Sequence, residues 1–145
     1  MSIFPTKILS AVDASEDSIL ALRSAVDLAN NNDSELHVLH VGLASFWTTP
    51  DAMHPEEAER LEESSRQTLD EQVEKVEGAS EAVAEKHLKM GEKVDEQIVN
   101  LADEIGAGLI LVGSRGKNTM ERLLLGSVAE SVVRHAHCPV LVVRQ

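Results

Sequence analysis

Aromatic side chains are almost absent from this sequence. Its 145 residues include only Phe4, Phe46 and Trp47, and there is no tyrosine. Hydrophobic residues nevertheless make up 43% of the chain, which is enough to build a core in a chain of typical domain length. A core without aromatic rings must consist of Leu, Ile, Val and Ala, a composition that suits a parallel sheet covered by helices. We therefore expect a single α/β domain over residues 1–145.

Cysteine and long apolar runs are scarce as well. Cys138 is the only cysteine, which excludes an internal disulfide. The apolar residues that follow it favour a buried, unreactive thiol over a reactive one. No apolar run approaches the roughly 20 residues that a membrane-spanning helix needs, and the N-terminal residues show no signal-peptide pattern. We expect no membrane insertion and a cytoplasmic location.

Basic residues are also few. The chain carries 25 acidic and 13 basic residues, for a formal net charge of −12. A field of this sign repels phosphate backbones, which argues against nucleic acid as a partner. It also argues against binding to an anionic membrane surface.

Short apolar runs alternate along the chain with segments of helical periodicity. The first expected helix begins after Ser15, a candidate N-cap, and Glu16 and Asp17 are placed to suit the dipole of this helix. Three further helices are expected over about 56–77, 94–105 and 127–137. The expected strands are 7–13, 36–41, 82–90, 109–112 and 139–144. Charged residues within 82–90 make a central position unfavourable and predict an edge strand.

This alternation predicts a five-stranded parallel sheet of order 3-2-1-4-5, with right-handed crossovers and helices on both faces. The most apolar strands, the first and the fourth, then lie in the middle. Sheets of this kind bind ligands at the carboxyl ends of the strands, where the strand order reverses. Asp13 and Gly113 follow the two strands that meet at that point, so we expect a pocket between them.

A glycine-rich connection joins the fourth strand to the last helix. It reads Gly113-Ser114-Arg115-Gly116 and, after nine residues, Gly126-Ser127. Glycines let backbone amides approach an oligophosphate, and a helix N-terminus adds unpaired N–H groups. Ser127 could cap the helix and contact a phosphate, with Arg115 and Lys117 adding positive charge. The alternative is that these glycines only form turns.

Asp13 admits two interpretations. A carboxylate that ends a central strand can accept hydrogen bonds from ribose hydroxyls. It can equally serve as a turn or N-cap residue before the first helix.

Three segments together resemble the universal stress protein family: Asp13-Ala14-Ser15, the glycine-rich connection through Leu124-Leu125-Gly126-Ser127-Val128-Ala129-Glu130, and His137 to Val143. The resemblance covers the whole chain, and the G-x2-G-x9-G-[ST] spacing is that of the ATP-binding branch. It implies a Rossmann-like fold similar to that of adenine nucleotide alpha hydrolases. It also implies ATP or another adenine nucleotide as ligand, and the surface charge suggests Mg²⁺ as a companion of the triphosphate.

The resemblance also implies roles for individual residues. Asp13 would hold the ribose, the backbone of Val41 would contact adenine, and Val12 and Val112 would line the base pocket. The phosphates would be surrounded by Gly113, Arg115, Gly116, Gly126, Ser127 and Val128. Ala129 departs from the family, which often has a hydroxyl residue there, at a cost of about 1 kcal/mol in binding.

The function expected from these observations is that of a stress-response regulator, in which bound nucleotide tunes conformation, assembly or the binding of a regulatory protein partner. The last strand, Val140, Leu141, Val142 and Val143, presents an apolar edge that predicts a homodimer or higher homo-oligomer. One alternative is a nucleotide-free dimeric stress protein. Another is an adenylating enzyme of similar fold, against which the acidic Asp13–Asp17 segment argues.

Catalytic and metal sites are not expected. No nucleophile with a partnered base is evident in the sequence, so we expect at most slow ATP hydrolysis. His135 and His137 suit the negative pole of a helix, and His37 and His40 point to opposite faces of one strand.

Overall fold

The computed structural model describes residues 4–43, 54–115 and 125–145. Five strands and five helices are assigned within these ranges. In chain order they are β1 (Lys7–Ala11), α1 (Glu16–Asn32), β2 (Glu35–Leu43), α2 (Pro55–Glu74), α3 (Ala79–Ala82), β3 (Val83–Gly91), α4 (Val94–Ile105), β4 (Ala107–Gly113), α5 (Ser127–His135) and β5 (Val140–Val143).

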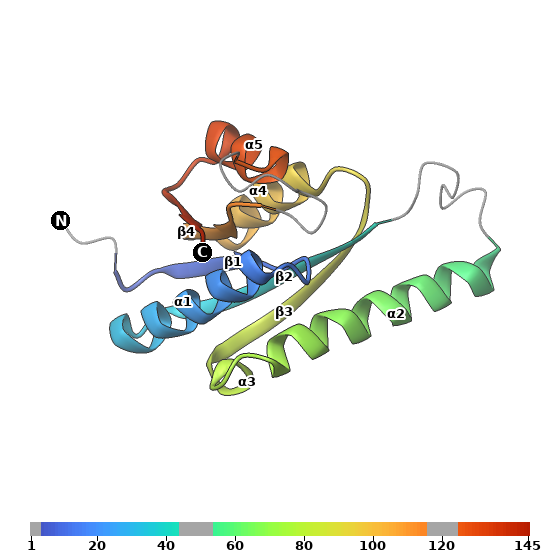
Figure 1. Cartoon of the computed structure of the whole chain (residues 1–145), viewed down its shortest axis with the longest axis horizontal. Coiled ribbons are helices and arrows are strands. Elements are labelled where there is room, and N and C mark those ends of the chain that lie inside the picture. Colours follow the sequence, from blue (N-terminus) through green and yellow to red (C-terminus); the bar gives the residue numbers. More distant parts are fainter. Residues whose placement is uncertain (1–3, 44–53, 116–124) are drawn as a thin grey trace.

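The strands form one sheet of order β3-β2-β1-β4-β5, and every neighbouring pair is parallel. Helices α1, α2 and α3 cover one face of the sheet, and α4 and α5 cover the other (Figure 1). The predicted fold class, strand order and edge position of β3 are therefore confirmed.

The hydrophobic core has two layers, one on each face of the sheet. Successive residues of β1 supply both layers, because Ile8 packs with α1 and α2 whereas Leu9 packs with α4 and α5; both are fully buried. A strand that is buried on both faces reads as a continuous apolar run, which explains why the central strands were the clearest in the sequence. Because β1 and β4 are buried on both faces, the end of each apolar run in the sequence marks the end of the strand.

The helix boundaries follow local sequence signals with two differences. Ser15 caps α1 as predicted, since its hydroxyl accepts a hydrogen bond from the Ser18 N–H at 3.1 Å. Helix α2 ends at Glu74, a few residues earlier than predicted. After it, Gly78 adopts the left-handed conformation and begins the unpredicted one-turn helix α3.

Cys138 is only partly buried, whereas the sequence predicted a buried thiol. Burial, together with the nearby charge of Asp103, raises the pKa of its thiol. The thiol therefore stays protonated and weakly nucleophilic at neutral pH.

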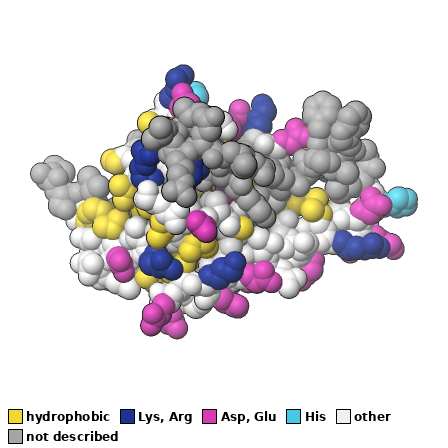
Figure 2. Space-filling model, viewed as in Figure 1, with side chains coloured by type: hydrophobic (Ala, Val, Ile, Leu, Met, Phe, Trp, Pro, Cys, Tyr) yellow, Lys and Arg dark blue, Asp and Glu magenta, His cyan; other side chains and the backbone are white. Residues whose placement is uncertain are grey.

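The surface shows no single dominant patch of charge on the face seen in Figure 2. Acidic and basic side chains are interspersed over the described residues of that face. Within the same described ranges, no helix combines the length and the apolar character needed to cross a membrane.

Candidate functional site

A cavity of about 510 Å³ lies at the carboxyl ends of the central strands. This volume falls within the usual range for small-molecule sites, about 300–1,000 Å³. Its wall is built from the ends of β1, β2 and β4, one face of α2, the start of α4 and the first turn of α5. The cavity therefore lies where the strand order reverses, the position that the sequence predicted for a pocket.

Most of the predicted site residues line this cavity. Those that do are Val12, Asp13, Val41, Val112, Gly113, Arg115, Ser127 and Val128. Gly126 is buried directly before α5 but is not part of the lining. Gly116 and Lys117 lie outside the described residues. The structure thus brings residues from both ends of the chain to one place.

Asp13 is positioned by a tight turn between β1 and α1. Its carboxylate accepts a hydrogen bond from the Ser15 N–H at 3.0 Å, and its own N–H donates to the Ser18 hydroxyl at 3.2 Å. The turn is tied to α2 by the buried Gln72, whose side-chain oxygen accepts from the Ala14 N–H at 2.5 Å. Asp13 therefore has the predicted turn role, and it also faces the cavity. The two roles are compatible because a carboxylate offers about four acceptor positions.

The interior of the cavity is apolar and its rim is polar. Val12, Val41, Val112 and Ile98 are buried residues of the inner wall. His40, Ser65 and Thr68 supply polar groups on the β2 and α2 side. The Nδ1 atom of His40 lies 2.9 Å from the Val12 carbonyl oxygen, and because a carbonyl only accepts, Nδ1 carries the proton.

Arg115 is held by a buried carboxylate. Asp17 is only 2% exposed, and it accepts hydrogen bonds from the Ser114 hydroxyl at 2.7 Å and from Arg115 Nε at 3.3 Å. Burial alone would raise the pKa of Asp17, but the bonds from Ser114 and Arg115 outweigh it and hold the pKa below its ordinary value.

This pair gives both residues a further role. Asp17 lies in the first turn of α1 as predicted, and it is also a buried anchor for the segment after β4. Arg115 lines the cavity, and its positive charge is paired with Asp17.

The N-terminus of α5 opens onto the cavity. Ser127 is the first helical residue rather than the cap, which corrects its predicted capping role, and the cap residue is Gly126. Among the described residues, no side chain caps this helix. The first-turn N–H groups of a helix lack partners within the helix, and Ser127, Val128 and Ala129 of that turn line the cavity. Such a turn can bind an anionic group.

Comparison with known proteins decides the family. The universal stress protein family matches residues 5–144. This chain belongs to that family. Universal stress protein YxiE of Bacillus subtilis is 38% identical over 95% of this chain and 98% of its own length.

Solved structures of other universal stress proteins have the same fold. UspA from Lactobacillus plantarum superimposes with a TM-score of 0.81 at 28% identity, covering 97% of this chain and 99% of its own. A universal stress protein solved in complex with cAMP gives a TM-score of 0.66 at 25% identity, covering 97% of this chain and 98% of its own.

Sequence reasoning missed several residues of this universal stress protein's cavity. His40 was considered only as a metal ligand, and Ser65 and Thr68 only as part of the helix expected over about 56–77. The position of β2 beside the central strand β1 could have suggested His40, because residues near the carboxyl end of such a strand reach the pocket. The rotation of α2 about its axis, which selects Ser65 and Thr68, is fixed by packing of Leu69 and Val73 in the core.

Proposed function

We propose that this universal stress protein binds an adenine nucleotide, ATP in the first place, in the cavity between Asp13 and the first turn of α5. The observation that carries the proposal is the meeting of two groups across an apolar cavity at the topological switch point. One is a carboxylate, and the other is a helix N-terminus that no side chain of the described residues caps. The structure of a relative in complex with cAMP supports the ligand class.

The lining residues fit the parts of such a ligand. The apolar wall formed by Val12, Val41 and Val112 suits a planar base, and the Asp13 carboxylate suits ribose hydroxyls. The phosphates would lie toward Gly113, Arg115 and the first turn of α5, with Gly116, Gly126, Ser127 and Val128 completing their surroundings. Because the chain carries a net charge of −12, Mg²⁺ would accompany a triphosphate and screen its charge.

The protein would act as a regulator rather than as a dedicated enzyme. One group of side chains between α4 and α5 contains a hydroxyl, an imidazole and a carboxylate, those of Ser131, His135 and Asp95. The Ser131 hydroxyl donates to Asp95 at 2.6 Å, and none of the three residues lines the cavity. This grouping does not activate a nucleophile. Nucleotide occupancy would instead tune conformation, self-association through Val140–Val143, or the binding of a regulatory protein partner, in the cytoplasm.

Thermal unfolding and calorimetry with Mg-ATP test the proposal. Nucleotide at 100 times its dissociation constant should stabilise the fold by about 2.7 kcal/mol. The Asp13→Asn variant should bind about tenfold to a hundredfold more weakly, because it loses a charge-assisted hydrogen bond to the ligand. Asp33→Asn is the matched control, since it makes the same charge change at an exposed residue with left-handed backbone that Asn tolerates.

Two results would contradict the proposal. One is the absence of any stabilisation by ATP, ADP, AMP or cAMP, which would favour the nucleotide-free alternative. The other is an equal change of affinity in the Asp13 and Asp33 variants, which would leave Asp13 without a specific role in binding.

A further inference from the structure

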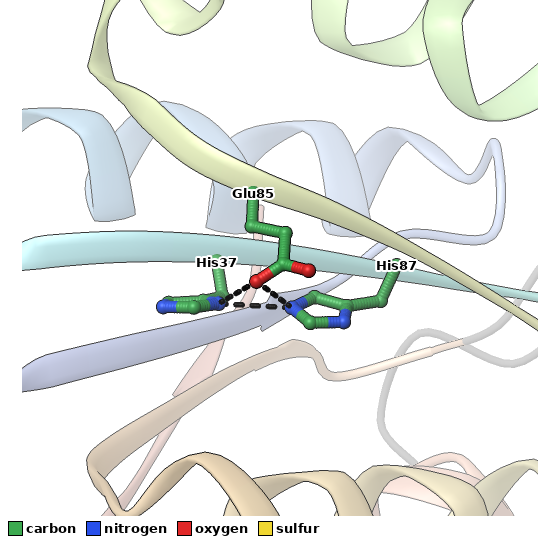
Figure 3. Close-up of side chains that lie close together, drawn as sticks. All are labelled: His37, Glu85 and His87. Carbon is green, nitrogen blue, oxygen red and sulfur yellow. Dashed lines mark hydrogen bonds and ion pairs between the residues drawn. The ribbon is translucent and has the colours of Figure 1, made fainter.

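Two histidines and a glutamate converge at the β2–β3 edge of the sheet, away from the cavity. His37 comes from β2, and Glu85 and His87 come from β3, with the Glu85 carboxylate directed toward both imidazole rings (Figure 3). None of the three lines the nucleotide cavity. His37 Nδ1 and His87 Nε2 lie 2.9 Å apart, and Glu85 Oε2 lies 3.9 Å from the first and 3.7 Å from the second.

The second ring nitrogen of His37 determines which atom can bind a metal. His37 Nε2 lies 2.8 Å from Glu35 Oε1, and because a carboxylate accepts, the proton of this bond belongs to Nε2. In the neutral ring the Nδ1 atom then carries a lone pair directed at His87. A histidine whose outer N–H donates to a carboxylate is the usual arrangement of a metal ligand.

The spacing of the three ligand atoms suits a tetrahedral ion. Zinc–nitrogen and zinc–oxygen distances of about 2.0–2.1 Å place neighbouring ligand atoms about 3.4 Å apart. The observed separations of 2.9, 3.7 and 3.9 Å lie on both sides of this value, so shifts of a few tenths of an ångström bring all three atoms to the required distance. We propose that His37, Glu85 and His87 form a Zn²⁺ site, with water in the fourth position.

The surroundings favour this occupant. His37 is buried and thereby fixed, whereas the Glu85 side chain is 62% exposed, so an ion can enter from solvent. Glu35 and Glu104 add negative charge near the rings, and Lys89 opposes it.

Metal binding requires one proton to move. Without metal, His87 Nε2–H donates to the lone pair of His37 Nδ1. With metal, both of these nitrogens are ligands, and the proton of His87 moves to its Nδ1 atom through the other neutral tautomer. The ion then links β2 to the edge strand β3. Binding should therefore raise the unfolding temperature of the chain in the absence of nucleotide.

The experiment uses the full chain after removal of metal with a chelator. Zn²⁺ is titrated in competition with a chromophoric chelator, and Co²⁺ serves as a spectroscopic probe of tetrahedral coordination. We expect one equivalent to bind, and the His87→Gln and Glu85→Gln variants each to lose at least tenfold in affinity. His135→Gln and Glu92→Gln are the matched controls on other surfaces and should keep the wild-type affinity. Circular dichroism establishes that each variant is folded.

The Glu35→Gln variant separates a metal site from a simple hydrogen-bonded pair of rings. Loss of a carboxylate behind a ligating histidine should weaken Zn²⁺ binding about tenfold while the tetrahedral Co²⁺ spectrum persists. Wild-type affinity no greater than that of His87→Gln would overturn the proposal. Loss of binding in His135→Gln alone would also overturn it, by placing the ion elsewhere on the surface.

Discussion

At the scale of single residues, Asp17 shows how a buried charge organises the site. Its carboxylate joins the start of α1 to Ser114 and Arg115 after β4, two segments almost a hundred residues apart in sequence. Truncating either partner leaves the other charge without its counterpart in a poorly solvated position, which is costly. The pair therefore holds the β4 end of the cavity in place, and it leaves less free positive charge there.

The Asp17 pair should make stability depend on pH in the acid range. The pKa of Asp17 in the folded chain lies below the 3.8 of an unperturbed carboxyl. Ionised Asp17 thus contributes stability that is fully present above the unfolded pKa and is lost as the pH falls through the folded pKa. At pH 7 the Asp17→Asn variant should have a free energy of unfolding about 1–3 kcal/mol below that of the wild type.

Urea unfolding between pH 7 and about pH 2 tests this expectation. The difference between the wild type and Asp17→Asn should shrink as the pH falls, because protonation removes the same charge from the wild type. Ser114→Ala, which removes one of the three side-chain hydrogen bonds to Asp17, should show an intermediate pH dependence. A difference that stays constant over this range would contradict the role given to the charge.

Sequence reasoning placed some of these residues and missed others for a physical reason. Asp13 and Gly113 were placed well because apolar runs buried on both faces mark the ends of β1 and β4, and strand order then brings those ends together. The contacts of Asp17 with Arg115 and of His37 with His87 depend on helix rotation and on strand register. These are set by packing across the whole sheet and leave no local pattern in the sequence.

At the scale of elements, the first turn of α1 closely approaches the end of β4 beside the site. A Cβ atom added at Gly113 would lie 2.7 Å from the Ser18 backbone nitrogen and 2.8 Å from the Asp17 carbonyl carbon. Both atoms belong to the first turn of α1 and cannot move without the helix. Gly113 therefore has a packing role, whatever its contact with phosphate.

The Gly113→Ala variant should lower the free energy of unfolding by about 1–3 kcal/mol, the usual cost of overpacking. Gly108→Ala, on the same strand, is the control. The three atoms nearest to its added Cβ belong to the Thr6 side chain rather than to the backbone of a helix, so its cost should be smaller. Urea unfolding measures both variants. Equal losses would show that α1 can shift as easily as the Thr6 side chain.

At the scale of the whole molecule, β5 leaves one edge of the sheet unpaired within the described chain. The Leu141 side chain on this strand is 42% exposed, and Val140, Val142 and Val143 are partly buried. An apolar edge of this kind favours pairing with a second copy. The net charge of −12 opposes association, so salt should strengthen it by screening the repulsion.

We expect a homodimer in light scattering at moderate salt, and a monomer for Leu141→Lys, because the substitution places a charge on the pairing edge. Gln67→Lys makes the same change in net charge at an exposed position of α2 and should remain dimeric. The control matters because each substitution also reduces the overall repulsion, which by itself would favour association. A wild type that stays monomeric at every protein and salt concentration would rule out pairing through β5. In that case the proposed nucleotide occupancy would have to act through conformation or through a different partner.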